Sequence, residues 1–182
     1  MVDVIDRIVR LFNERGSTAY LGEPVSQLEH ALQSAFAAEG EQATATVISA
    51  ALLHDIGHLL HQLPDDCAEH GIDDRHEELG YRFLLKHFGP EVSEPVRLHV
   101  PAKRYLCAIE PEYYLALTPT SQRSLELQGG AFTVIEAEVF GRNPHAAHAV
   151  AVRRYDDLAK VAGLKTPDLD YFVRYLESAV QA

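Results

Sequence analysis

The chain has 182 residues, 47% hydrophobic and 24% charged, which suits one globular domain with an ordinary core. Its formal net charge of -11 excludes a surface that attracts the phosphate backbone of nucleic acid or an anionic membrane. No apolar run is long enough to span a membrane, and residues 1–6 lack the basic and apolar segments of a signal peptide. Cys67 and Cys107 show no metal or redox spacing, which predicts a cytoplasmic protein with free thiols.

Apolar residues recur with helical spacing along almost the whole chain, and no segment alternates as a strand does. This periodicity predicts an all-α fold, with helices over residues 4–13, 25–38, 43–60, 76–88, 91–100, 120–128, 132–141, 145–162 and 169–180. The acidic stretch 63–75 is predicted to be a surface loop between two metal-bearing helices. No repeat or linker divides the chain, so residues 1–182 are predicted to form a single domain.

Histidine and aspartate residues on these predicted helices form a candidate metal-binding set. Its members are His30, the adjacent pair His54 and Asp55, His76, His99 and Asp156. Neutral imidazoles and carboxylates are ligands for a pair of first-row transition metals, and a carboxylate bridges two ions readily. A histidine and an aspartate side by side in an otherwise apolar helix need a partner to offset their desolvation. Gly57 follows the pair and admits the close approach of a partner helix. The set predicts a dinuclear metal enzyme.

Further polar residues are spaced so that they face the same cavity. His58 lies four residues after His54 on one helix face, which suits a substrate donor. Arg153 and Lys160 flank Asp156 on one stripe and suggest an anion site, although both cations have an equally good role in helix salt bridges. Serines at the start of a helix suit an anion or a cap equally; they are Ser121 and Ser124. The remaining histidines are interpreted as surface or internally satisfied residues: His61, His70, His87, His145 and His148.

Several segments together carry a resemblance to a known family. They are residues 20–30, 54–58, 99–105, 127–130 and 153–160. The His-Asp pair resembles the HD-domain superfamily, an all-helical fold named for that pair. The segments in this order resemble a narrower group, the mixed-valent diiron oxygenases that cleave the carbon–phosphorus bond of 1-hydroxyphosphonates. The resemblance implies a single-domain HD-domain helical bundle with a buried dinuclear metal site.

The resemblance also implies a division of the ligands between two irons, with Asp55 as the bridge. One iron is held by His30, His54, Asp55 and Asp156. The other is held by Asp55, His76 and His99, and it keeps open positions for the substrate's C1 hydroxyl and one phosphonate oxygen. An Fe(II)/Fe(III) pair fits such chemistry, whereas zinc has no accessible redox change.

Residues for the substrate follow from the same resemblance. The other phosphonate oxygens are met by His58, Lys103, Ser121, Ser124 and Arg153. Tyr20 is implied to close over the open iron until substrate arrives, and Glu23 to face the ammonium end of the substrate. The group closest to the reacting atoms is therefore predicted to be Tyr20, Glu23, His58 and Lys103.

The implied reaction joins dioxygen and a small hydroxyphosphonate, with no nucleic-acid or membrane partner, and leaves the oligomeric state open. The substrate is 2-amino-1-hydroxyethylphosphonate, which yields glycine and phosphate, or its trimethylammonio analogue, which yields glycine betaine. Both remain open.

Rival hypotheses share the same ligands. An HD-type phosphohydrolase would hold magnesium, manganese or other divalent ions and hydrolyse nucleotides or phosphate esters without using oxygen. A carbon–carbon cleaving oxygenase of the inositol type would share the diiron core but not the phosphonate contacts. A non-catalytic signalling HD domain usually loses metal ligands, and this chain keeps the full set.

Overall fold

A computed structural model describes residues 4–20, 22–61, 63 and 71–181 of the protein. In these ranges the chain forms helices and no strand, which confirms the all-α prediction. The helices are α1 Val4–Arg15, α2 Gln27–Gly40, α3 Ala45–Leu53, α4 Ile56–Leu60, α5 His76–Phe88, α6 Pro90–Ile109, α7 Tyr113–Ala116, α8 Pro119–Leu127, α9 Val134–Gly141, α10 Ala146–Leu158 and α11 Leu169–Ala179. Cys67 and His70, which the sequence interpretation named, lie outside the described residues.

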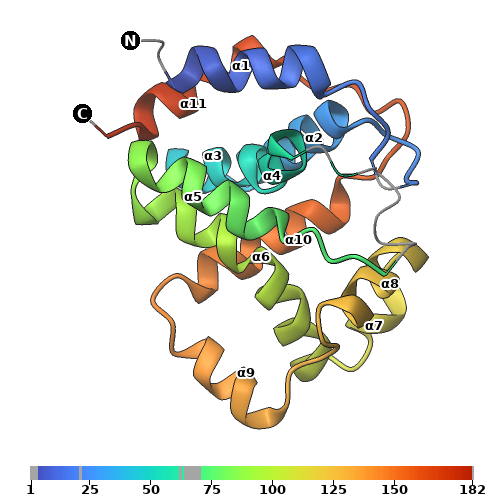
Figure 1. Ribbon diagram of the computed structural model, residues 1–182. Coiled ribbons are helices and arrows are strands. Elements are labelled where there is room, and N and C mark those ends of the chain that lie inside the picture. Colours follow the sequence, from blue (N-terminus) through green and yellow to red (C-terminus); the bar gives the residue numbers. More distant parts are fainter. Residues whose placement is uncertain (1–3, 21, 62, 64–70, 182) are drawn as a thin grey trace.

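The helices pack around α3, which is apolar on nearly every side. Its residues from Val47 to Leu53 are buried, as expected of a helix enclosed by its neighbours. Figure 1 shows α1 and α11 across one end of the molecule, α2, α3 and α4 in the middle, and α7, α8 and α9 at the opposite end. The long helix α6 packs mainly against α5 and α10. The metal-binding candidates come from the central helices, where the core holds them in place.

The single helix predicted over residues 43–60 is wrong, because the chain breaks at His54 and Asp55 into α3 and α4. His54 still has helical dihedral angles, but Asp55 has φ -102° and ψ 12°. In an unbroken helix the carbonyl of Ala51 would accept the amide of Asp55. Here the His54 ring donates to that carbonyl, with 2.8 Å between Nδ1 and the oxygen. The helix break therefore frees the Ala51 carbonyl to orient the ring of His54, a candidate metal ligand.

The prediction for residues 91–100 is too short, because α6 continues through Pro95 and Pro101 to Ile109. A proline inside a helix removes one backbone hydrogen bond and costs roughly 3 kcal/mol, which is why the sequence pattern appears to end there. Packing of α6 between α5 and α10 offsets that cost. The extra turns carry Lys103 into the interior. The short helix α7 was not predicted.

The predicted surface loop over residues 63–75 is described at residue 63 and over residues 71–75, and the latter segment leads directly into α5. Arg75 has φ 51° and ψ 39°, in the left-handed region, immediately before His76. Residues 71–73 and Arg75 are exposed, as predicted for a surface loop, but Asp74 is turned inward, with 8% of its side chain exposed. None of the helices in the described ranges is both long and apolar enough to cross a membrane.

Candidate active site

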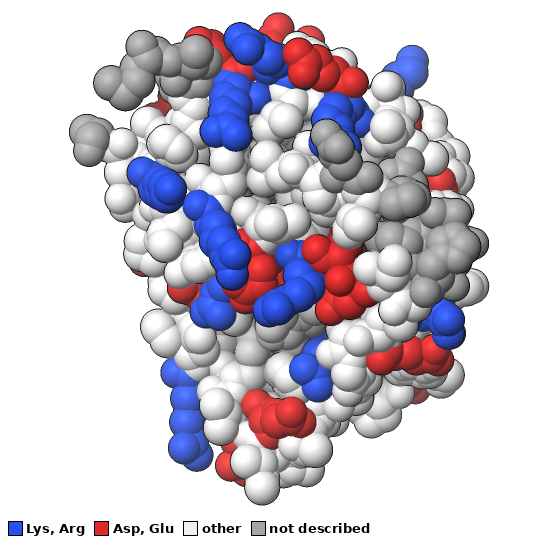
Figure 2. Space-filling view, in the orientation of Figure 1, with Lys and Arg blue, Asp and Glu red and all other residues white. Residues whose placement is uncertain are grey.

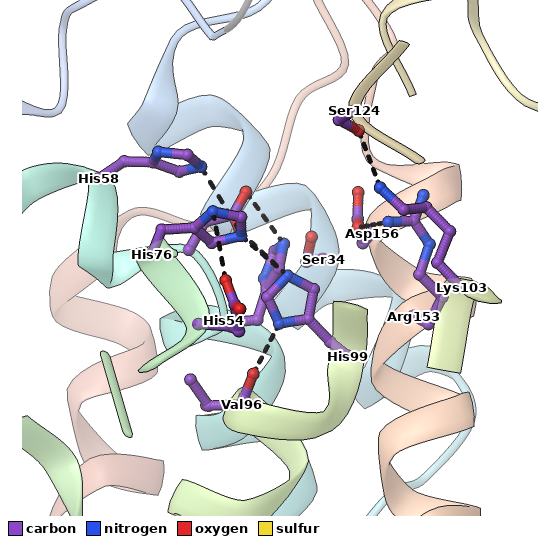
Figure 3. A network of polar contacts seen from close by, with 12 residues as sticks. Ser34, His54, His58, His76, Val96, His99, Lys103, Ser124, Arg153 and Asp156 are labelled. Atoms are coloured by element: carbon purple, nitrogen blue, oxygen red, sulfur yellow. Dashed lines mark hydrogen bonds and ion pairs between the residues drawn. The ribbon is translucent and has the colours of Figure 1, made fainter. Parts of the chain in front are cut away.

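The predicted metal-binding residues converge in the interior of the helical bundle. All of them are buried, from 0% exposure at His30 and His54 to 8% at Asp55. Figure 3 shows the rings of His54, His76 and His99 turned toward one another, with Asp156 beside them. Three groups of ligand atoms lie close enough together for one ion each, and two of them consist of the predicted ligands; the third is His58, Asp74 and His76. We call His30, His54 and Asp156 the inner group, and Asp55, His76 and His99 the outer group.

Hydrogen bonds fix which nitrogen of each ring faces the centre. The Nδ1 atoms of three rings donate to backbone carbonyls: His30 to Ala159 at 2.8 Å, His54 to Ala51 at 2.8 Å and His99 to Val96 at 2.6 Å. The Nδ1 atom of His76 lies 2.8 Å from a carboxylate oxygen of Asp74. These partners accept hydrogen bonds, so each ring carries its proton on Nδ1 and turns Nε2 inward as a metal ligand.

The inward nitrogens face one another in pairs. His30 Nε2 lies 3.1 Å from His54 Nε2, and His76 Nε2 lies 3.2 Å from His99 Nε2. In neutral rings these atoms carry lone pairs, which repel at such distances unless a cation offsets them. Burial lowers the pKa of His30 and of His99 to about 4, which keeps both rings neutral at pH 7. Burial opposes charge on the facing rings too, but Asp55 raises the pKa of His54, and Asp55 with Asp74 raises the pKa of His76 well above its usual value. A metal ion bound at each pair would take the place of the proton held there. The donor atoms are therefore arranged for bound cations.

Asp55 reaches both groups with different oxygens. Its Oδ2 atom lies 3.6 Å from His30 Nε2 and 3.4 Å from His54 Nε2. Its Oδ1 atom lies 3.3 Å from His76 Nε2 and 3.4 Å from His99 Nε2. Burial by itself would raise the pKa of Asp55, but the surrounding imidazoles hold it well below its usual range. An ionised carboxylate with one oxygen toward each pair of imidazoles has the geometry of a bridging ligand.

Two buried carboxylate oxygens of the candidate ligands have no hydrogen-bond partner among the described residues, namely Asp55 Oδ1 and Asp156 Oδ1, although the Lys160 ammonium lies 3.2 Å from the latter. Buried ionised oxygens without a donor are costly, and a metal ion satisfies them without any protein N–H group. The donor set of imidazoles and carboxylates also suits a first-row transition metal better than calcium or magnesium. The residues thus fit a pair of metal ions.

A cavity opens onto the outer group. Asp55, His76 and His99 all line it, whereas in the inner group Asp156 does so and His30 and His54 do not. The predicted substrate residues line the same cavity: Tyr20, Glu23, His58, Lys103, Ser121, Ser124 and Arg153. The structure therefore brings together every candidate named from the sequence, although their individual roles stay predictions.

Lys103 is the cation whose environment is most unusual. It is 2% exposed, and its ammonium donates to Ser124 Oγ at 2.8 Å (Figure 3). Burial, with the neighbouring Arg153, lowers the pKa of Lys103 to about 7. Ser124 in turn donates to the carbonyl of Ser121 at 3.1 Å on the first turns of α8. A bound anion would restore full charge to this lysine.

Arg153 makes the helix ion pairs that the sequence left as an alternative, and it still lines the cavity. Its Nη1 atom lies 2.6 Å from Asp156 Oδ2, and its Nη2 atom pairs with Asp157. Burial would raise the pKa of Asp156, but Arg153 and Lys160 hold it well below its usual range. Arg153 therefore holds a candidate metal ligand in addition to any contact with substrate.

The segment before α2 places an aromatic ring and a carboxylate over the cavity. The Tyr20 ring stacks on His30 with 3.8 Å between centroids, and burial raises the pKa of Tyr20 well above its usual value. Glu23 accepts a hydrogen bond from the Thr118 hydroxyl at 2.6 Å, which ties this segment to the start of α8. The sequence interpretation missed this tie because Thr118 lies far from Glu23 along the chain.

Lys160, which the sequence placed at an anion site or in a helix salt bridge, and Asp74, to which the sequence assigned no role, both lie at the site. Lys160 lines the cavity, with its ammonium 3.2 Å from Asp156 Oδ1 and 3.5 Å from Ser121 Oγ. Asp74 contacts His58 and His76 from the described end of the predicted surface loop. Burial would raise the pKa of Asp74, but the hydrogen bonds from these rings hold it well below its usual range. Its position two residues before a candidate ligand was the available signal in the sequence.

Charged side chains on the outside do not form a large basic patch on the face in view. Figure 2 shows acidic and basic side chains intermixed there. The formal net charge of -11 points the same way. Both observations agree with a small-molecule site and offer no surface for a nucleic-acid backbone on that face.

Comparisons with known proteins agree with the fold. The chain matches the HD domain family over residues 27–128, more than half of its length. It is 46% identical over 178 residues to the hydroxymethylphosphonate dioxygenase of Gimesia maris, covering 97% of this chain and 88% of the relative. It is 39% identical over 178 residues to a glycine-betaine-forming 1-hydroxy-2-(trimethylamino)ethylphosphonate dioxygenase of Leisingera caerulea, covering 98% and 91%. An uncharacterised protein of Acanthamoeba polyphaga mimivirus is 33% identical over 177 residues, covering 94% and 80%.

The helical fold and the buried His-Asp ligand set are those of an HD-domain metal-binding protein. The chain belongs to the HD-domain family and, within it, to the group that contains these two dioxygenases.

Proposed function

We propose that this protein uses dioxygen and a pair of iron ions to cleave the carbon–phosphorus bond of a 1-hydroxyphosphonate. The products are a carboxylic acid and inorganic phosphate. One O2 per substrate balances the reaction, because both oxygen atoms are accounted for in the products and no external reductant is consumed. A mixed-valent Fe(II)/Fe(III) pair supplies the redox and Lewis-acid chemistry when it is bound.

The observation that carries this proposal is the placement of Asp55 between two pairs of imidazoles beside a cavity with buried cations. The outer group has three protein ligands and faces the cavity, which leaves room there for a substrate and oxygen. Lys103, Arg153 and Lys160 supply positive charge for the phosphonate, and the hydroxyls of Ser121 and Ser124 supply hydrogen bonds. His58 lines the same cavity, and with a proton on each ring nitrogen it would donate from Nδ1 to Asp74 and from Nε2 to a further phosphonate oxygen.

Among possible substrates we place hydroxymethylphosphonate first, which yields formate. The relative that bears this name is more similar to the chain than the one that acts on the trimethylamino compound. One of the two Glu23 oxygens, which a substrate ammonium would need, already accepts a hydrogen bond from Thr118. The sequence interpretation considered the amino and trimethylammonio substrates and not this smaller one.

The proposal also includes the remaining expectations from the sequence. We propose that residues 1–182 form one domain and that the protein acts in the cytoplasm. The spacing of Cys67 and Cys107 supports a reducing compartment, and Cys107 is a free thiol.

Metal analysis and coupled product assays test the proposal. The purified protein should hold about two irons per chain and consume one O2 for each phosphate released. Hydroxymethylphosphonate, 2-amino-1-hydroxyethylphosphonate and its trimethylammonio analogue should be compared side by side, with formate, glycine and glycine betaine measured as products. Stoichiometric magnesium or manganese, hydrolysis of phosphate esters and no oxygen uptake would instead establish the phosphohydrolase alternative.

A further inference from the structure

The Asp74 carboxylate contacts two residues that line the cavity, His58 on α4 and His76 on α5. Its Oδ1 atom accepts from His76 Nδ1 at 2.8 Å and from the His76 backbone amide at 3.3 Å. Its Oδ2 atom lies 2.7 Å from His58 Nδ1 and 2.9 Å from His61 Nε2. A carboxylate has about four acceptor positions, so these contacts use its full capacity.

Each of these contacts determines where the opposite ring nitrogen points. Because His76 gives its Nδ1 proton to Asp74, its Nε2 atom faces His99 and Asp55 as a metal ligand. Because His58 also uses Nδ1, its Nε2 atom is buried with no partner among the described residues and lies 4.0 Å from Asp55 Oδ1. The same carboxylate thus aims one ring at the outer metal position and the other into the substrate cavity.

The two rings are also in contact with each other. Their centroids lie 4.0 Å apart with an interplanar angle of 21°, so His58 and His76 are stacked. His61 braces the carboxylate from the far side, and its own orientation is fixed because its Nδ1 atom accepts the Leu63 amide at 3.2 Å. A shift of Asp74 would therefore move both rings together.

We propose that Asp74 is a positioning residue that couples the outer metal ligand His76 to the substrate contact His58. This inference rests on the proposed function for the role of His58 and on the ligand set for the role of His76. It predicts that one substitution weakens metal retention and phosphonate binding together, although Asp74 touches neither metal nor substrate.

The test compares Asp74→Asn with Asp170→Asn, the same chemical change at an exposed position on α11. Iron per chain is measured after dialysis against a chelator, and binding of inorganic phosphate is measured by calorimetry without oxygen. Asp74→Asn should weaken retention of one of the two metals by about 10- to 100-fold, the usual effect of losing a carboxylate behind a ligand histidine. It should also weaken phosphate binding. Asp74→Glu, which keeps the acceptor oxygens, should retain metal better than Asp74→Asn.

A double-mutant cycle with His58→Asn separates coupling from simple loss of metal. His58→Asn alone should weaken phosphate binding and leave both metals in place. In that background Asp74→Asn should still weaken metal retention, but with enough iron present to keep both positions filled it should add little to the loss of phosphate binding. Fully additive losses of phosphate binding, or wild-type metal retention in Asp74→Asn, would overturn the inference. A wild-type protein that holds two metals but consumes no oxygen would overturn the proposed function and leave the metal half of this test intact.

Discussion

The inner and outer ligand groups are held in place by different parts of the chain. In the inner group the rings of His30 and His54 are fixed by backbone carbonyls at a helix end and a helix break. In the outer group the ring of His99 is likewise fixed by the backbone carbonyl of Val96, whereas His76 is fixed by a side chain, Asp74, which also contacts a residue of the substrate cavity. A ring held by a backbone carbonyl moves only if the helix changes, whereas a ring held by a side chain moves when that side chain is substituted. We therefore expect single substitutions near His76 to change metal binding at the outer position more easily than at the inner one.

The largest expected effect belongs to the residue that both groups share. Asp55→Ala should remove both metals, because each pair of imidazoles faces one of its oxygens. His99→Ala should instead deplete the outer position and leave the inner one occupied, since this ring belongs to one group. Metal content per chain, with circular dichroism to verify the fold, distinguishes these results. Equal and mild losses in the two variants would contradict the assignment of a bridge.

A substitution at Gly57 should damage the outer group through the backbone. A Cβ atom there would lie 2.0 Å from the carbonyl oxygen of His76, so the start of α5 must shift. We expect Gly57→Ala to lower the free energy of unfolding by about 1–3 kcal/mol, as overpacking does, and to release the outer metal first. Gly40→Ala is the control, because a Cβ atom there has nothing within 4 Å. Thermal melts and metal analysis measure both effects, and identical behaviour of the two variants would contradict the prediction.

Lys103 should affect substrate binding and leave both metals in place, since it is not a ligand. Lys103→Met should weaken binding of inorganic phosphate or phosphonate by about 2 kcal/mol, on the order of 30-fold, because a charge-assisted contact is lost. Anaerobic calorimetry measures the affinity, and iron content is the control. Loss of iron together with affinity would show that the lysine supports the metal site instead.

Lys103 should also make the affinity for phosphonate depend on pH. Its pKa of about 7 means that the ammonium is charged below that pH and loses its proton above it. Phosphonate affinity should therefore fall as the pH rises through about 7. Lys103→Arg remains charged throughout, so the ratio of the two affinities isolates the lysine from the substrate's own ionisation. A constant ratio from pH 6 to pH 9 would contradict the assignment.

The smallest expected effect concerns the tie between Glu23 and the start of α8. Thr118→Val removes that hydrogen bond and the cap of α8, and Thr133→Val removes only the corresponding cap of α9. Each should lower the free energy of unfolding by about 1 kcal/mol. Only Thr118→Val should also change KM, by a few-fold, since Thr118 donates to the cavity residue Glu23 and Thr133 has no such contact. Steady-state phosphate release for both variants gives the answer.

The helical class and the residues that converge as candidate ligands were predictable because they depend on residue type and local period. His54 and Asp55 stand out as polar residues in an apolar helix, and that contrast is visible in the sequence. The break at the same pair was not predictable, because it depends on a ring competing for the carbonyl of Ala51. The helix end predicted before Pro101 was wrong, because packing against α5 and α10 keeps α6 helical beyond this proline, and such tertiary packing is not visible in the sequence.

Asp74 was misread for a related reason. Acidic residues in a weakly periodic stretch are usually solvated, and nothing in the sequence places this one against His58 and His76. The single-domain organisation and the separate roles of the substrate residues stay predictions, whereas the HD-domain fold and its membership in the dioxygenase group are confirmed.

Arg75, between Asp74 and His76, adopts an unfavourable backbone conformation that fits the geometry of the site. A non-glycine residue in the left-handed region carries an unfavourable energy of roughly 1 kcal/mol, yet the chain adopts it here with φ 51°. This residue turns the backbone between Asp74 and His76, so that the Asp74 carboxylate accepts a hydrogen bond from the His76 ring at 2.8 Å. A stabilising redesign that relaxed this residue would risk pulling the carboxylate away from the ring. Tolerance to engineering should therefore be lowest in this tripeptide, even though it belongs to a loop.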